Sequence, residues 1–212
     1  MPEINNLESY PPLSSRDRIL FAAKHLFARN GYENTSTVAI AREAATSESQ
    51  LMKHFGSKQG LLAAIFDRGW ATIAERMQIV QGHGAAADRL VAVLEAVVIE
   101  LENDADLKEL MMLEARRIRK DNRDVLVSQG YQQFSNVIDG ILRLMREQGK
   151  VRPGINLEAV RAALVGMTEG LMRDQIVAKR SGISASYTFA DVKQVLELIV
   201  PAFSVEGVHI RR

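Results

Sequence analysis

Residues 35–58 read TSTVAIAREAATSESQLMKHFGSK, and this stretch contains the most informative pattern in the chain. Its opening hydroxyl residues are typical helix caps, and they predict a short helix over residues 37–43. A tight turn then leads to a second short helix, expected over residues 47–54. Ser47 and Gln50 have the spacing of a capping box at the start of this second helix.

The second short helix has two different faces. Leu51 and Phe55 point one way and serve as apolar anchors. The opposite face and its flanks carry hydroxyl, amide, thioether and amine groups, from Ser49, Gln50, Met52 and Lys53. The major groove of DNA admits one α-helix and offers donors and acceptors on its base edges, so this face suits DNA. The pattern by itself favours a helix-turn-helix and an ordinary corner of a helical bundle about equally.

Helical periodicity extends over most of the chain, which predicts an all-α protein. Residues 1–13 are polar and contain Pro11-Pro12, so they are expected to form a flexible N-terminal arm. Further helices are expected over residues 14–30, 58–80, 86–102, 105–119, 123–148, 157–179 and 188–203. The sequence is therefore divided into the arm, a three-helix helix-turn-helix head at 14–57 and a helical body at 58–212.

Composition excludes several classes of function. The 212 residues include no cysteine and four histidines, so a disulfide framework, a thiol nucleophile and a cysteine-rich zinc site are excluded. No nucleophile–base pair, metal-ligand spacing or phosphate loop is visible, so neither an enzyme nor a cofactor is expected. The first residues do not resemble a secretory signal and no apolar run reaches about 18 residues, which predicts a cytoplasmic protein without a membrane span. Net charge is +1, but bases outnumber acids over residues 14–60, as suits contact with phosphate.

In order and spacing, part of the chain resembles the signature of the TetR (tetracycline-repressor-like) family. The matching residues are Gly31-Tyr32, Thr35-Ser36, Ile40-Ala41, Ala44, Ser47, Leu51, His54-Phe55-Gly56, Ser57-Lys58 and Leu61-Leu62. The resemblance implies a homodimer whose two heads occupy adjacent major grooves of a palindromic operator. It also implies a body that binds a small-molecule effector, here unidentified, and a repressor that the effector releases from DNA. A non-specific architectural DNA-binding protein and a helical protein-interaction module are the alternatives.

The resemblance carries DNA-binding roles over to nine positions. Contacts to backbone phosphates are implied for Thr35, Ser36, His54 and Lys58, and a place on the recognition face is implied for Ser47, Ser49, Gln50, Met52 and Lys53. Gln50 could pair with adenine, and Lys53 with guanine or phosphate. Ser47 could equally act only as a cap.

The sequence departs from the family pattern within this same stretch. Ala45 stands where glycine is usual, Thr46 replaces valine and Met52 replaces tyrosine. Ala45 requires a turn that either avoids a left-handed backbone or accepts strain. Glu48 brings a negative charge toward DNA unless it caps the helix or reads cytosine.

The body offers candidates for the effector pocket and the dimer interface. An apolar pocket is expected among Val97, Met111, Met112, Ile138 and Met145, because methionine adapts to irregular spaces. The resemblance places the subunit interface within 157–203, with candidates Leu164, Gly166, Gly170, Leu196 and Ile199. For both sets the alternative is an ordinary helical core.

Overall fold

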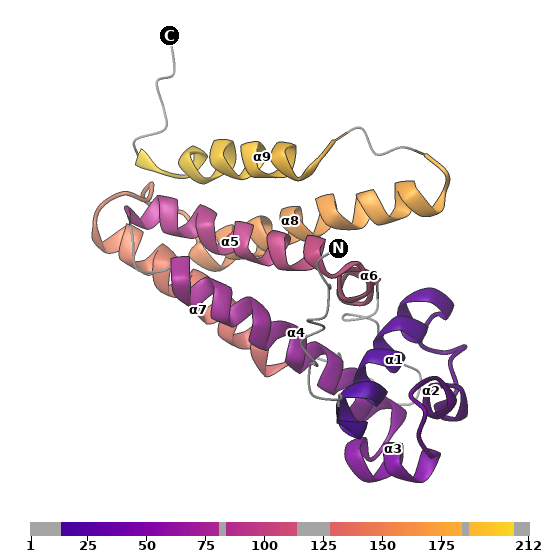
Figure 1. Cartoon of the computed structure of the whole chain (residues 1–212). Coiled ribbons are helices and arrows are strands. Elements are labelled where there is room, and N and C mark those ends of the chain that lie inside the picture. Colours follow the sequence, from indigo (N-terminus) through magenta and orange to yellow (C-terminus); the bar gives the residue numbers. More distant parts are fainter. Residues whose placement is uncertain (1–13, 81–83, 114–127, 184–186, 206–212) are drawn as a thin grey trace, which may run out of the picture. The chain divides into compact units, whose positions relative to one another are not determined.

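The computed structural model describes residues 14–80, 84–113, 128–183 and 187–205, and the regular structure in that part of the chain is helical apart from one β-bridge between Val151 and Ser204 (Figure 1). The helices are α1 (Ser15–Asn30), α2 (Thr37–Glu43), α3 (Glu48–Phe55), α4 (Lys58–Val80), α5 (Ala86–Asn103), α6 (Ala105–Leu113), α7 (Gln129–Glu147), α8 (Leu157–Arg180) and α9 (Phe189–Ala202). The predicted all-α class is confirmed. The proposed arm at 1–13 lies outside the described residues, as do parts of the helices expected over 105–119 and 123–148.

The chain divides into two compact units, Met1–Leu62 and Ala63–Arg212, with the boundary inside α4. In the first unit α1, α2 and α3 pack against one another around a small apolar core. The residues buried there include Ile19, Ala23, Phe27, Ile40, Ala41, Leu51, Leu61 and Leu62. Capping sets the ends of α1: the Ser14 side chain accepts a hydrogen bond from the Asp17 N–H, and Gly31 follows the last turn at φ 82°.

In the second unit α5 is the central helix and packs against α6, α7, α8 and α9. Figure 1 shows it between α9 and α7. Its buried residues lie on most sides of the helix and include Leu90, Val93, Leu94, Val97, Val98 and Leu101. α9 begins with a capping box, in which the Asp191 carboxylate accepts hydrogen bonds from the N–H and hydroxyl of Thr188. These two bonds, the N–H first, lower the pKa of Asp191.

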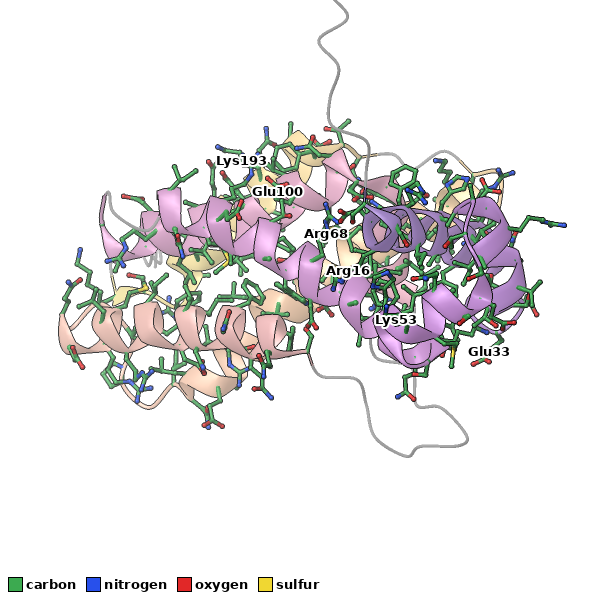
Figure 2. The ribbon with its side chains drawn as sticks, turned by 60° about the horizontal axis from the view of Figure 1, so that its bottom comes forward. Arg16, Glu33, Lys53, Arg68, Glu100 and Lys193 are labelled. Atoms are coloured by element: carbon green, nitrogen blue, oxygen red, sulfur yellow. The ribbon has the colours of Figure 1, made fainter. Side chains whose placement is uncertain are left out.

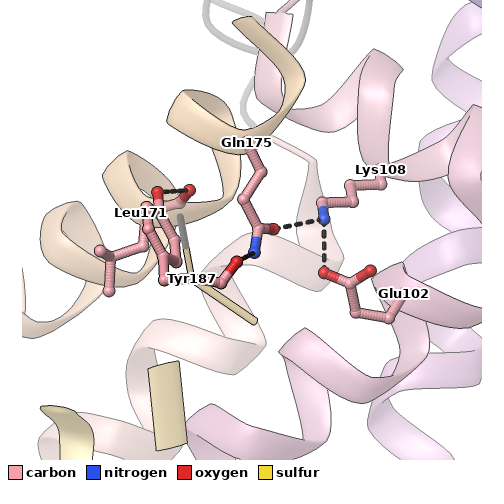
Figure 3. A network of polar contacts seen from close by, with 5 residues as sticks. All are labelled: Glu102, Lys108, Leu171, Gln175 and Tyr187. Carbon is pink, nitrogen blue, oxygen red and sulfur yellow. Dashed lines mark hydrogen bonds and ion pairs between the residues drawn. The ribbon is translucent and has the colours of Figure 1, made fainter. Parts of the chain in front are cut away.

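A polar network crosses the second unit and joins α5, α6 and α8 to the segment before α9 (Figure 3). The buried Lys108 of α6 forms an ion pair with Glu102 and donates to Gln175 Oε1 at 2.9 Å. Gln175 donates in turn to the main-chain carbonyl of Tyr187. The Tyr187 hydroxyl donates to the Leu171 carbonyl at 2.7 Å, which ties this segment to α8.

No described helix is both long enough and apolar enough to cross a membrane.

Candidate nucleic-acid interface

Two serines set the starts of the helix pair α2–α3. Ser36 caps α2, and its hydroxyl accepts the Ala39 N–H at 3.1 Å. Ser47 caps α3 in the same way and accepts the Gln50 N–H at 3.2 Å. A serine hydroxyl that accepts such a bond still has its own proton to donate. Because both serines are exposed, each can cap its helix and also donate to a phosphate oxygen.

The turn between α2 and α3 adopts the left-handed backbone that its sequence disfavours. Ala45 has φ 47°, the one described residue other than glycine with a positive φ. Its N–H donates to the Arg42 carbonyl at 3.1 Å, and the Thr46 N–H donates to the Ala41 carbonyl at 2.9 Å. This bond pair is a Schellman motif, which usually has glycine in the place of Ala45. Of the two outcomes open for Ala45, the protein therefore accepts the strain.

α1 holds this turn in place. Arg18 Nε donates to the Ala44 carbonyl at 3.1 Å, which gives that carbonyl at the end of α2 a side-chain donor. The sequence alone does not indicate this role for Arg18, because no local pattern connects Arg18 on α1 with Ala44 after α2. The angle between α2 and α3 is thus supported from a third helix.

α3 buries one side and exposes the other, as its pattern predicts. Leu51 is fully buried and anchors the helix to the core. The outward residues Ser49, Gln50, Met52, Lys53 and His54 are all exposed, Met52 by 44%. Lys53 is labelled in Figure 2. An anchored helix with hydroxyl, amide and amine groups on its free side has the form that major-groove recognition requires.

Thr35, which was expected to contact a backbone phosphate, is buried instead. Its side chain is only 2% exposed, so it is not placed to contact phosphate. The hydroxyl donates to two main-chain carbonyls, that of Gly31 at 2.9 Å and that of Leu26 at 3.2 Å. Thr35 therefore joins the start of α2 to the end of α1, while its neighbour Ser36 provides the exposed cap.

Lys58 and Glu48 both have partners inside the first unit. The Lys58 ammonium lies 4.3 Å from the centroid of the Tyr32 ring and 3.4 Å from the Glu33 carbonyl oxygen. The Glu48 carboxylate, in the first turn of α3, accepts a hydrogen bond from the Thr37 hydroxyl. This bond, together with the favourable position of an acid at a helix N-terminus, accounts for Glu48 in a region otherwise suited to phosphate.

The residues expected to line a pocket are all buried in the second unit. Val97 lies on α5, Met111 and Met112 on α6, and Ile138 and Met145 on α7. Among the described residues no group of three or more histidine, aspartate and glutamate side chains is arranged to hold a metal ion.

The candidate interface residues separate into two groups. Leu164 and Leu196 are 1% and 0% exposed, so their side chains pack inside the second unit, and their place at a dimer interface stays a prediction. Gly166 and Gly170 have open space where a Cβ would stand, and Ile199 is 38% exposed. These three residues remain accessible to a partner.

A helix-turn-helix with an anchored α3 and an exposed polar face, in an otherwise helical chain, defines a DNA-binding transcriptional regulator. Residues 19–65 match the family model for bacterial regulatory proteins of the tetR family. The fatty acid metabolism regulator protein of Bacillus subtilis is 25% identical over 166 residues, which cover 74% of this chain and 84% of that relative. The transcriptional regulator UidR of Escherichia coli is 24% identical over 166 residues, covering 76% of this chain and 81% of that relative. Residues 19–65 therefore resemble the tetR family, and the chain is similar to transcriptional regulators over about three quarters of its length.

Solved structures agree with this assignment at the level of the fold. FadR from Bacillus subtilis, in complex with stearoyl-CoA, matches with a TM-score of 0.75 and 23% identity. The match covers 91% of this chain and 99% of FadR. The arrangement of a helix-turn-helix followed by a helical domain is therefore shared over nearly the whole length of both chains.

Proposed function

We propose that this protein is a homodimeric repressor that binds a palindromic operator through α3 and leaves it when a small molecule binds the second unit. The observation that carries the proposal is the exposed polar face of α3 opposite the fully buried Leu51. On this face Gln50 and Lys53 contact base edges, an amide with adenine and an amine with guanine. Ser36, His54 and Lys58 contact backbone phosphates and set the register of α3.

Ser47, Ser49 and Met52 complete the proposed DNA surface. The two hydroxyls donate to phosphate or to base acceptors, and the exposed Met52 thioether supplies an apolar contact such as the methyl group of thymine. Because the surface contains no catalytic constellation, no enzymatic activity is proposed. A bacterial operator lies in the cytoplasm, which is therefore the proposed location of the protein.

Dimerisation is proposed to use the exposed sides of α8 and α9. Gly166 and Gly170 leave open space on α8, which lets another helix approach closely. On α9, Leu198 is 74% and Ile199 is 38% exposed, and Val177 on α8 is 50% exposed. A two-fold dimer would bury this apolar surface and would match the two-fold symmetry of a palindromic operator.

The effector is proposed to carry a long apolar chain. Two observations support this class: FadR of Bacillus subtilis has been solved with stearoyl-CoA, and the expected pocket residues are apolar side chains of three different helices. Met111, Met112 and Met145 are unbranched and can rearrange around an acyl chain. Release from DNA follows if the effector binds better to a conformation in which the two heads do not match the operator spacing.

The DNA-binding proposal is tested by selecting bound duplexes from a random pool. The expected result is an enriched palindrome whose base preference relaxes in Gln50→Ala and Lys53→Ala. Gln78→Ala and Lys179→Ala, exposed residues outside the helix-turn-helix, serve as matched controls and should leave the preference unchanged. Salt-sensitive binding without an enriched sequence would instead indicate an architectural protein, and no binding would indicate a protein-interaction module.

The effector proposal is tested on the selected duplex with stearoyl-CoA, a short-chain acyl-CoA and free CoA. Only stearoyl-CoA is expected to release the DNA and to raise the midpoint of thermal unfolding, because ligand binding to the folded state stabilises it. If none of the three has either effect, the acyl class is refuted and the DNA-binding proposal stands.

A further inference from the structure

Arg16, in the first turn of α1, lies against the end of the recognition helix. Its guanidinium carbon is 5.2 Å from the centroid of the Phe55 ring, and Phe55 is the last residue of α3. Arg16 is exposed and Phe55 is half-buried. The face of an aromatic ring attracts a cation and restricts the many rotamers of an arginine side chain. The contact therefore holds a positive charge beside α3 although the charge comes from another helix.

A second contact connects the same two helix ends. Ser15 Oγ lies 3.4 Å from His54 Nε2, and His54 is one of the residues proposed to contact phosphate. Lys53 is its neighbour in the chain. The start of α1 thus brings a guanidinium and a hydroxyl to the end of α3, where they contact Phe55 and His54.

We propose that Arg16 binds a DNA phosphate at the edge of the groove that α3 enters. This inference rests on the proposed DNA-binding function and adds a contact from α1 to it. Stacking uses the face of the guanidinium and leaves its in-plane N–H groups to bind two phosphate oxygens. Phosphates are the same at every base pair, so Arg16 contributes affinity and position but no sequence preference.

Arg16→Gln in the full-length protein tests this inference on the duplex enriched by selection. Affinity is expected to fall about tenfold, and the negative slope of log K against log salt is expected to become less steep by about 0.9, the value for one lost phosphate contact. The order of affinities among operator variants should not change. Arg16→Lys keeps the charge without the planar fork, so it should keep the wild-type salt slope and lose only part of the affinity.

Arg29→Gln is the matched control, because Arg29 is an exposed arginine in the last turn of the same helix. The inference is overturned if the salt slope of Arg16→Gln equals that of the wild type, or if Arg29→Gln has the same effect. Wild-type protein that binds no duplex would overturn the proposed function itself. The two failures are therefore distinguishable in one set of titrations.

Discussion

The ion pair between Lys108 and Glu102 should respond very differently to the loss of either partner. The Lys108 side chain is 10% exposed, whereas that of Glu102 is 38% exposed. The ammonium therefore depends on Glu102 for its counter-charge, with Gln175 Oε1 at 2.9 Å as a neutral second acceptor. The carboxylate, by contrast, can turn to water if the ammonium is removed. This difference in burial predicts that removing Glu102 lowers the free energy of unfolding more than removing Lys108 does.

Glu102→Gln leaves a buried ammonium with only neutral acceptors. Removing one partner of a fully buried ion pair costs about 3–5 kcal/mol, and the partial exposure of Glu102 reduces the expected loss to about 2 kcal/mol. Lys108→Met keeps most of the apolar stem and removes the charge. The expected loss in the free energy of unfolding is about 0.5–1 kcal/mol, similar to that of an exposed ion pair. The Glu102 carboxylate is then hydrated, and only Gln175 loses a hydrogen bond.

The double variant provides the sharper comparison. Once Lys108 is methionine, no buried charge remains, so adding Glu102→Gln should cost almost nothing and the double variant should be more stable than Glu102→Gln alone. Urea unfolding followed by circular dichroism measures these free energies, at one fixed protein concentration because the proposed dimer would contribute to stability. Glu197→Gln, at an exposed pair with Lys193, is the control and should change little. If Lys108→Met destabilised as much as Glu102→Gln, the burial argument would be refuted.

Four further predictions concern the turn, the DNA surface and the α8–α9 connection. Ala45→Gly should raise the free energy of unfolding by about 0.5–1 kcal/mol, measured in urea, without changing the DNA base preference, because glycine adopts φ 47° without strain. Thr35→Val should lower the free energy of unfolding by about 1–3 kcal/mol, because two main-chain carbonyls lose a buried donor. The salt dependence of DNA binding should not change. Glu48→Gln should tighten DNA binding a few-fold in a titration at low salt, since a negative charge is removed near phosphate; a change in base preference instead would show that Glu48 reads a base. Burial first, and then Asp174, raise the pKa of Tyr187 to about 12, so the stabilisation by its neutral hydroxyl is complete below pH 10 and is lost as pH rises toward 12. In a spectrophotometric titration Tyr187→Phe should remove the tyrosine ionisation near pH 12.

Helix starts and ends were predictable where a local chemical signal marks them. Ser14, Ser36 and Ser47 cap α1, α2 and α3, and Gly31 stops α1, all within the stretches where the sequence predicts helix ends. The choice between Thr35 and Ser36 as the cap of α2 was not predictable. Both carry hydroxyls, and the decision depends on the carbonyl of Leu26, in the preceding helix, which the Thr35 hydroxyl reaches only after the chain has folded.

The assignment of faces on the long helices shows a second limit. The sequence places apolar residues such as Leu164 and small residues such as Gly166 in the helix expected over 157–179, but periodicity cannot tell which of them packs inside the protomer. The structure buries Leu164 and leaves Gly166 open. On α9 the structure likewise buries Leu196 and leaves Ile199 partly exposed. An apolar residue at helical spacing indicates burial, whereas the identity of its neighbour depends on the whole packing arrangement.

Ala45 shows why a departure from the family pattern leaves the DNA-binding geometry intact. A non-glycine residue in the left-handed region costs about 1–2 kcal/mol, which by itself would favour a different turn. Two main-chain bonds of the Schellman motif and the bond from Arg18 to the Ala44 carbonyl oppose such a change. Any other backbone at Ala45 would break at least one of them and move α3 away from α2. The orientation of α3 is therefore determined by contacts behind it, so its exposed residues can change without disturbing that orientation.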